Sequence, residues 1–139
     1  MRFEKMKKYM PSHVSMQKYA PIILRIGMSL VFFIFAYMQL TDPYNFIGYL
    51  PDFLFDTGFA RQIVYANAIF EILFGLLLIL GLFTRLAAFL LAVHLAVITY
   101  EIGFRMDGIR DFGLTVATFA IWLNGPDAWS LDKKWRKKK

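Results

Sequence analysis

The chain has 139 residues, of which 58% are hydrophobic and 19% charged, a balance typical of membrane proteins because soluble domains are about 45–50% apolar and about 25% charged. The absence of cysteine excludes disulfides, thiol redox chemistry and iron–sulfur ligation. The net charge of +6 comes largely from the two ends of the chain, which favours contact with anionic lipid headgroups and argues against nucleic-acid binding.

The predicted elements begin with a basic N-terminal segment, residues 1–20, and continue with four apolar runs that are candidates for membrane-spanning helices. We therefore predict an all-α, integral membrane four-helix bundle over residues 21–124, followed by a basic tail over residues 125–139. The last two runs are short, so they would need tilt or shielding by neighbouring helices to span the bilayer. The runs are residues 21–40, 63–83, 86–102 and 109–123.

Positive charge is concentrated on one side of this predicted domain. Both tails are rich in Lys and Arg, and Arg85 lies in the turn between the second and third runs, whereas the loop of residues 41–60 contains Asp but no Lys or Arg. We predict that both termini are cytoplasmic, in a multi-pass protein of the cell (inner or plasma) membrane. The first run is too long for a signal peptide and lacks a cleavage site, so we expect a retained helix.

The loop of residues 41–60 is dense in aromatic side chains and is broken by proline. Such a segment is typical of an interfacial belt at headgroup level, which is the interpretation that we prefer. The alternative is a lid over a cavity that opens away from the cytoplasm.

Each predicted helix carries one polar stripe, because positions that are 4, 7 and 11 residues apart share a helix face. Lipid cannot satisfy polar groups, so we expect the four stripes to face one another in a polar bundle interior. The stripes comprise Arg25, Ser29, Phe32, Ala36 and Gln39; Asn67, Glu71, Gly75 and Leu78; Ala87, His94, Ile98 and Glu101; and Asp111, Thr115, Thr118 and Trp122.

Six residues of these stripes are candidates for a ligand or proton site, because ionisable groups inside a membrane are costly and are by default functional. Glu71 and His94 are predicted to meet near the midplane, on antiparallel neighbouring helices. The chain shows no nucleophile–base constellation and no metal-ligand spacing, so we predict no metal site and leave catalysis open. The six candidates are Glu71, His94, Asn67, Arg25, Glu101 and Asp111.

Structural interpretations of the same residues stay open. Arg25 could extend to the surface or point inward to Glu71. Glu71 could be a neutral or Arg-paired carboxylate that locks the bundle together. His94 could be a packing residue, and Glu101 and Asp111 could mark the water interface.

Three motifs occur in order along the chain: LRIGMSLVFFIFAYMQLTDP, EILFGLLLILGLFTRLAAFLLAVHL and GPDAWSLDKKW. Together they resemble the DoxX family of small four-helix membrane proteins over about residues 24–135. The chain departs from the family's pattern at Asp127 and Ala128, where a Gly and a basic residue are common. The matching positions are Arg25, Gly27, Glu71, Gly75, Gly81, Thr84, Arg85, Gly125, Pro126, Ser130, Leu131 and Asp132.

The resemblance implies a membrane subunit linked to quinone or to redox complexes, because some relatives are membrane subunits of a thiosulfate:quinone oxidoreductase and others are associated with redox-defence complexes. It implies that any electron transfer here uses a bound quinone and leaves the redox centre to another membrane protein subunit. Glu71 and His94 would then bind the quinone carbonyl and relay protons, with Phe70 and Phe74 packed on the ring.

Two other functions stay open from the sequence. The first is a structural or assembly subunit of a larger membrane complex, in which Glu71 and Arg25 form a buried clamp. The second is a small proton-coupled transporter that uses Asn67, Glu101 and Asp111.

Overall fold

The structure is a computed structural model that describes residues 12–138. Within these residues the predicted all-α class is confirmed, because every regular element is a helix and no strand is present. Residues 1–11 of the expected basic N-terminal segment and Lys139 of the tail lie outside the described part. The helices are α2 (His13–Thr41), α3 (Tyr44–Ile47), α4 (Asp52–Phe55), α5 (Ala60–Leu80), α6 (Thr84–Ile102), α7 (Met106–Asn124) and α8 (Leu131–Arg136).

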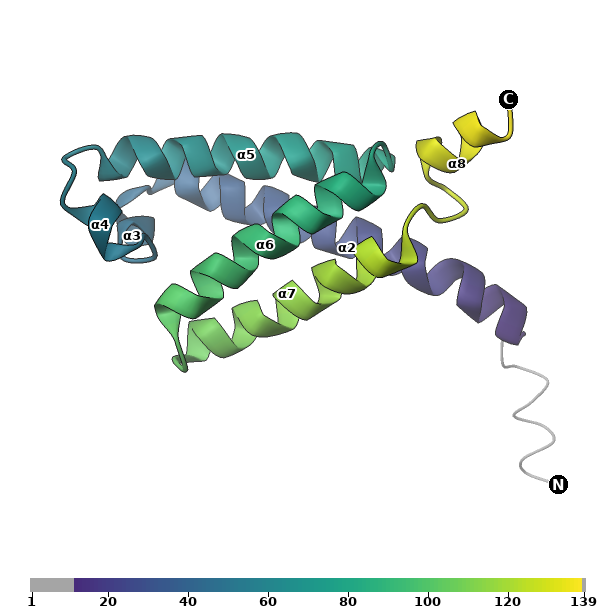
Figure 1. The fold of residues 1–139 in the computed structure, drawn as a ribbon, viewed down its shortest axis with the longest axis horizontal. Helices are drawn as coiled ribbons and strands as arrows, with labels where there is room; N and C mark the ends of the chain where they lie inside the picture. The colour runs from purple at the N-terminus through teal and green to yellow at the C-terminus, as the bar shows by residue number, and fades with distance from the viewer. Residues whose placement is uncertain (1–11, 139) are drawn as a thin grey trace, which may run out of the picture.

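The four long helices run alternately in opposite directions and form two pairs, α2 with α5 and α6 with α7 (Figure 1). The pairs converge at the turn between α5 and α6, which we call the closed end. They diverge toward α3 and α4, which we call the open end (Figure 1). Both ends of the described chain lie at the closed end.

The polar stripes predicted from periodicity face the interior where the helices pack. All five stripe residues of α2 are buried, from Arg25 to Gln39. An apolar core packs around the middle of this stripe, and the small side chains of Ala87 and Ala88 there let α6 approach its neighbours closely. The core comprises Met28, Phe32, Leu78, Ala87, Ala88, Leu91, Leu95 and Ile121.

A tight turn joins α5 to α6 at the closed end. Gly81 adopts φ 70°, in the left-handed region that favours glycine. The Leu82 N–H donates to the Leu77 carbonyl at 2.9 Å and the Gly81 N–H to the Leu78 carbonyl at 3.1 Å, which is the pattern of a Schellman cap. Helix α5 therefore ends at Leu80, before the end of the expected run over residues 63–83.

The long helices identify the chain as a membrane protein in contact with the lipid bilayer. Among the described residues three helices, α2, α5 and α6, are long and apolar enough to cross a membrane. Helix α7 has the same length as α6 but carries Asp107, Arg110 and Asp111 in its first two turns. The fourth expected span, residues 109–123, corresponds to α7, and its crossing stays a prediction.

Candidate functional site

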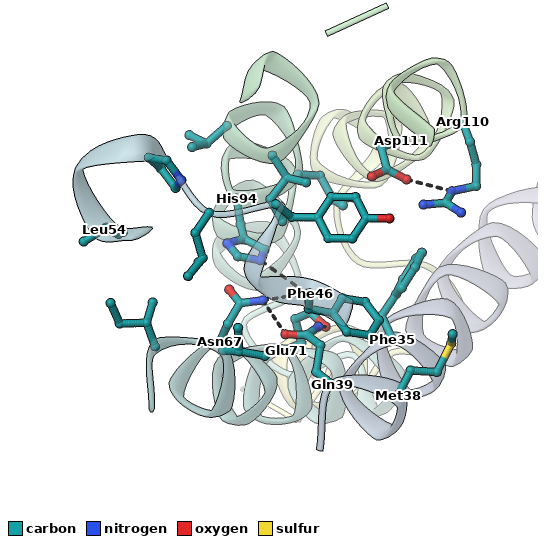
Figure 2. Close-up of a pocket in the computed structure, with 18 of the residues that line it drawn as sticks. Phe35, Met38, Gln39, Phe46, Leu54, Asn67, Glu71, His94, Arg110 and Asp111 are labelled. Carbon is teal, nitrogen blue, oxygen red and sulfur yellow. Dashed lines mark hydrogen bonds and ion pairs between the residues drawn. The ribbon is translucent and has the colours of Figure 1, made fainter. Parts of the chain in front are cut away.

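A cavity of about 390 Å³ lies between the two helix pairs toward the open end (Figure 2). All four long helices and the segment between α2 and α5 contribute to its wall. Its volume falls within the range of about 300–1,000 Å³ that is usual for ligand pockets. Most of the wall is apolar, and its aromatic side chains are Phe35, Phe46, Tyr49 and Phe53.

Four polar side chains, which we call the Glu71 cluster, meet on the cavity wall (Figure 2). Gln39 Nε2 donates to Oε2 of Glu71 at 2.8 Å. Asn67 Nδ2 donates to Oε1 of Gln39 at 2.7 Å and to Oε1 of Glu71 at 3.3 Å. His94 Nε2 lies 3.3 Å from Oε1 of Glu71, so the predicted meeting of Glu71 and His94 is confirmed.

The cluster is built by helix periodicity on three helices. Glu71 and Asn67 are one turn apart on α5, while Gln39 lies near the end of α2 and His94 in the middle of α6. Gln39 belongs to the predicted buried stripe of the first helix but was not among the six candidate site residues. Because its side-chain amide is neutral, the sequence alone does not indicate that Gln39 belongs to a site, and only its hydrogen-bond partners do.

The Glu71–His94 pair can hold one proton without net charge. The pair is neutral whether the proton lies on Glu71 or on His94, and the Glu71 oxygens can accept from the amides of Gln39 and Asn67 in either case. Glu71 is only 3% exposed, and a buried charge without compensation is strongly unfavourable. Adding or removing a proton here therefore changes the charge of a largely apolar cavity.

A second polar group, which we call the Arg110 group, lies on the α7 side of the cavity. Arg110 Nε donates to Oδ1 of Asp111 at 2.9 Å, and Nη1 lies 3.3 Å from Oδ1 of Asp107. The Tyr49 hydroxyl donates to Oδ2 of Asp107 at 3.3 Å. The Arg110 guanidinium also lies 5.3 Å from the ring centroid of Phe35. These contacts join α2, α7 and the segment between α2 and α5.

Residues 42–59, which we call the lid segment, cover the cavity at the open end. Six of their side chains line it, and Tyr44, Phe55 and Phe59 are exposed, as is Phe53, which lines the cavity but is 75% exposed. The exposed rings are in keeping with the preferred interpretation as an interfacial belt. The lining residues favour the alternative of a lid, so the segment combines both features. The lining residues are Phe46, Tyr49, Leu50, Pro51, Phe53 and Leu54.

Arg25 neither pairs with Glu71 nor extends to the surface, and both expectations for it were wrong. Its Nε donates to Oδ2 of Asp127 at 2.6 Å, and Nη2 to Oδ1 at 3.2 Å. Its Nη1 donates to the carbonyls of Leu78 and Ile79, which lie in the last turn of α5, where carbonyls accept hydrogen bonds from groups outside the helix. Arg25 is thus held at the closed end, away from the cavity.

Three other residues singled out in the sequence lie outside the cavity wall. Glu101 is exposed near the end of α6. The Phe70 ring packs against Phe74 and His94, with ring centroids 4.6 and 5.1 Å away, and Phe70 and Phe74 pack against the core. Neither ring lines the cavity that was expected to place them against a ligand, and Phe70 instead packs against His94. Asn67 and Asp111, by contrast, both line the cavity.

The sequence model of the DoxX family matches residues 20–103, which is more than half of the chain. The matched region contains all four residues of the Glu71 cluster and Arg25. It ends before α7, so the Arg110 side of the cavity and the loop with Asp127 lie beyond it. Neither the curated proteins nor the solved structures include a significant match.

Proposed function

This chain belongs to the DoxX family, and from that membership and the geometry of its cavity we propose that it is a quinone-binding accessory subunit of a membrane oxidoreductase complex. The observation that carries the proposal is the Glu71 cluster in the wall of an otherwise apolar, aromatic-lined cavity. Such a site suits a flat apolar ring that carries hydrogen-bonding oxygens.

The donor set fits a quinone headgroup. The Gln39 amide has a second N–H beyond the one that it donates to Glu71, and the imidazole of His94 is a further donor, whereas the Asn67 amide already donates twice within the cluster. The walls offer the rings of Phe35 and Phe46. A bound quinone would supply the redox group that the side chains of this protein lack, and with it two-electron, two-proton chemistry. The protein's own part would be to orient the ring, exclude water with the lid segment, and hold a proton between Oε1 of Glu71 and Nε2 of His94. The electrons would come from a redox centre in a partner subunit.

In this proposal α7 is the fourth membrane span, so residues 21–124 form the membrane domain and residues 125–139 the tail. The charges of α7 support this arrangement because they are confined to its first two turns and pair within the Arg110 group. Arg85 and the basic α8 both lie at the closed end, and the positive-inside rule then favours a cytoplasmic closed end in the cell membrane.

The alternative function, a structural or assembly subunit, depended mainly on a buried clamp formed by Glu71. A bundle clamp was expected between Arg25 and Glu71, but Asp127 takes the place of Glu71 in that pair. The neighbours of Glu71 are instead two neutral amides and a histidine, an environment that is typical of a binding or proton site. The transporter alternative would require a pathway through the packed core and the Arg25–Asp127 pair at the closed end.

The proposal is tested by quinone binding to the purified protein. Native mass spectrometry of gently extracted protein should find a retained quinone, and titration with a short-chain quinone should give a measurable Kd. His94→Ala and Glu71→Gln should each weaken binding about tenfold, because each alters one or two hydrogen bonds worth about 1 kcal/mol apiece.

Glu101→Gln is the matched control, since it removes a carboxylate of the membrane domain that lies outside the cavity. It should leave the Kd unchanged. Equal affinities in wild type, H94A and E71Q would overturn the assignment of the site, and a partner subunit that co-purifies without any quinone would favour the assembly role.

A further inference from the structure

A second hollow, of about 470 Å³, lies at the closed end between the start of α6 and α8. We call it the α8 groove. It is separate from the cavity of the Glu71 cluster, and nothing in the proposed function depends on it. Its wall includes Phe83, Arg85, Leu86, Asp132, Trp135 and Arg136.

Asp132 fixes α8 against the start of α6. Its Oδ1 accepts from the Phe83 N–H at 2.9 Å, and its Oδ2 accepts from the N–H and the hydroxyl of Thr84 at 2.8 and 2.9 Å. The Asp132 N–H donates to the Gly81 carbonyl at 3.0 Å. These bonds satisfy two of the otherwise unpaired N–H groups at the start of α6. They also occupy the one carboxylate side chain that lines the groove among residues 12–138.

The two arginines of the groove keep their positive charge available. Within residues 12–138 neither Arg85 nor Arg136 forms an ion pair. Arg85 lies against Gly125, where an added Cβ would be 2.6 Å from the Arg85 Nε, so the guanidinium packs directly over the backbone at this glycine. Two guanidinium groups from different elements thus face one groove, and their planar fork matches the oxygens of a phosphate.

Three large side chains in the remaining wall of the groove are apolar and exposed. Phe83, Leu86 and Trp135 are 64%, 54% and 61% exposed, and they surround the ends of α5 and α6, where these two membrane-spanning candidates reach the membrane surface. Tryptophan beside basic residues is typical of the headgroup region of a bilayer. A free phosphate would need the arginines alone, whereas a phospholipid would use both the arginines and the apolar wall.

We propose that the α8 groove binds the phosphate headgroup of an anionic phospholipid in the leaflet next to the closed end. Arg85 and Arg136 contact the phosphate, and Phe83, Leu86 and Trp135 contact the glycerol and the first part of the acyl chains. The tail is thereby fixed to the membrane at a defined site, in addition to the general attraction of its lysines.

The test is lipid titration of the full chain in mild detergent, followed by native mass spectrometry. Wild type should bind phosphatidylglycerol in preference to phosphatidylcholine. The double variant R85Q/R136Q should lose roughly 25-fold in phosphatidylglycerol affinity, about fivefold for each arginine, because glutamine cannot make the charge-assisted hydrogen bonds of a guanidinium to the phosphate. The matched control is K133Q/K134Q, which removes two charges of α8 outside the groove and should change the affinity less than about threefold.

Three results would overturn the proposal. Equal losses in R85Q/R136Q and K133Q/K134Q would show a diffuse attraction without a site. Equal binding of phosphatidylcholine and phosphatidylglycerol would show that the groove does not recognise an anionic headgroup. Displacement of the lipid by an equal concentration of inorganic phosphate would identify a free-phosphate site instead.

Helicity and thermal melting verify the fold of each variant. If R85Q/R136Q unfolds, R85K/R136K decides, because it keeps the charge but loses the planar fork and should still bind severalfold more weakly.

Discussion

Arg25 and Asp127 join three parts of the chain at one point. The guanidinium reaches from α2 to the last carbonyls of α5 and to the carboxylate in the loop that follows α7. Both side chains are almost completely buried. Removing one partner would leave the other as a buried charge without compensation, which costs about 3–5 kcal/mol.

We therefore expect Arg25→Gln and Asp127→Asn each to lower the free energy of unfolding in detergent by about 3–5 kcal/mol. Chemical denaturation followed by far-UV circular dichroism measures the loss. The exposed pair of Arg110 and Asp107 is the control, because its side chains are 47% and 43% exposed and such pairs contribute only about 0–1 kcal/mol. A similar loss in R25Q and D107N would show that the buried pair is not a special element of the fold.

The contrast between Glu71 and Arg25 shows how far the sequence predicts single contacts. Glu71 and His94 lie on regular helices, so periodicity and rise per residue were enough to predict that they meet. The partner of Arg25 lies in the irregular loop after α7, where no periodicity indicates the direction of a side chain. Asp127 stood out in the sequence only as a departure from the family's pattern, and its role required the tertiary structure.

The lid segment is the element that the sequence predicts least completely. Helices α3 and α4 have four residues each, too few for any apolar periodicity to appear. Aromatic content and prolines indicated a segment that does not span the membrane, and this much agrees with the structure. The contact between Tyr49 and Asp107 joins the lid segment to α7 over a long sequence separation, and local patterns contain no information about it.

The pKa of Tyr49 provides a test of this contact. Burial raises it above the ordinary value of 10.0, and the nearby charge of Asp107 and the hydrogen bond to it raise it further. The folded protein thus holds this proton more tightly than the unfolded chain. The stability that the contact contributes is complete below about pH 10 and is lost as the pH rises through the raised pKa.

Ultraviolet titration near 295 nm, taken as the difference between wild type and Y49F, should show a tyrosine that ionises above pH 10. Asp107→Asn should move that step toward the ordinary value, since it removes the negative charge. Asp56→Asn changes an exposed carboxylate of the same lid segment and should leave the step in place. A Tyr49 step that does not respond to D107N would show that the lid segment does not contact α7.

At the scale of the whole molecule, the two ends of the bundle differ in packing. The closed end has small residues on α6, a continuous apolar core and the Arg25–Asp127 pair. The open end has the cavity and the lid segment. The sequence predicted antiparallel helices with a polar interior, because charge and periodicity determine both. It did not predict that the pairs diverge, because divergence depends on how side-chain volumes fit between helices.

This asymmetry predicts a gradient of local stability along the bundle. Backbone amides exchange through local opening, which is easiest where few apolar groups are buried and hydrogen bonds are few. Hydrogen exchange measured by mass spectrometry in nanodiscs should therefore be slowest in residues 78–91 and fastest in the lid segment. A short-chain quinone should slow exchange in the lid segment and around His94 but not in α8, and H94A should abolish this effect. A lid segment that exchanges as slowly as residues 78–91 without ligand would mean a permanently closed cavity, and ligand entry would then require the helix pairs themselves to separate.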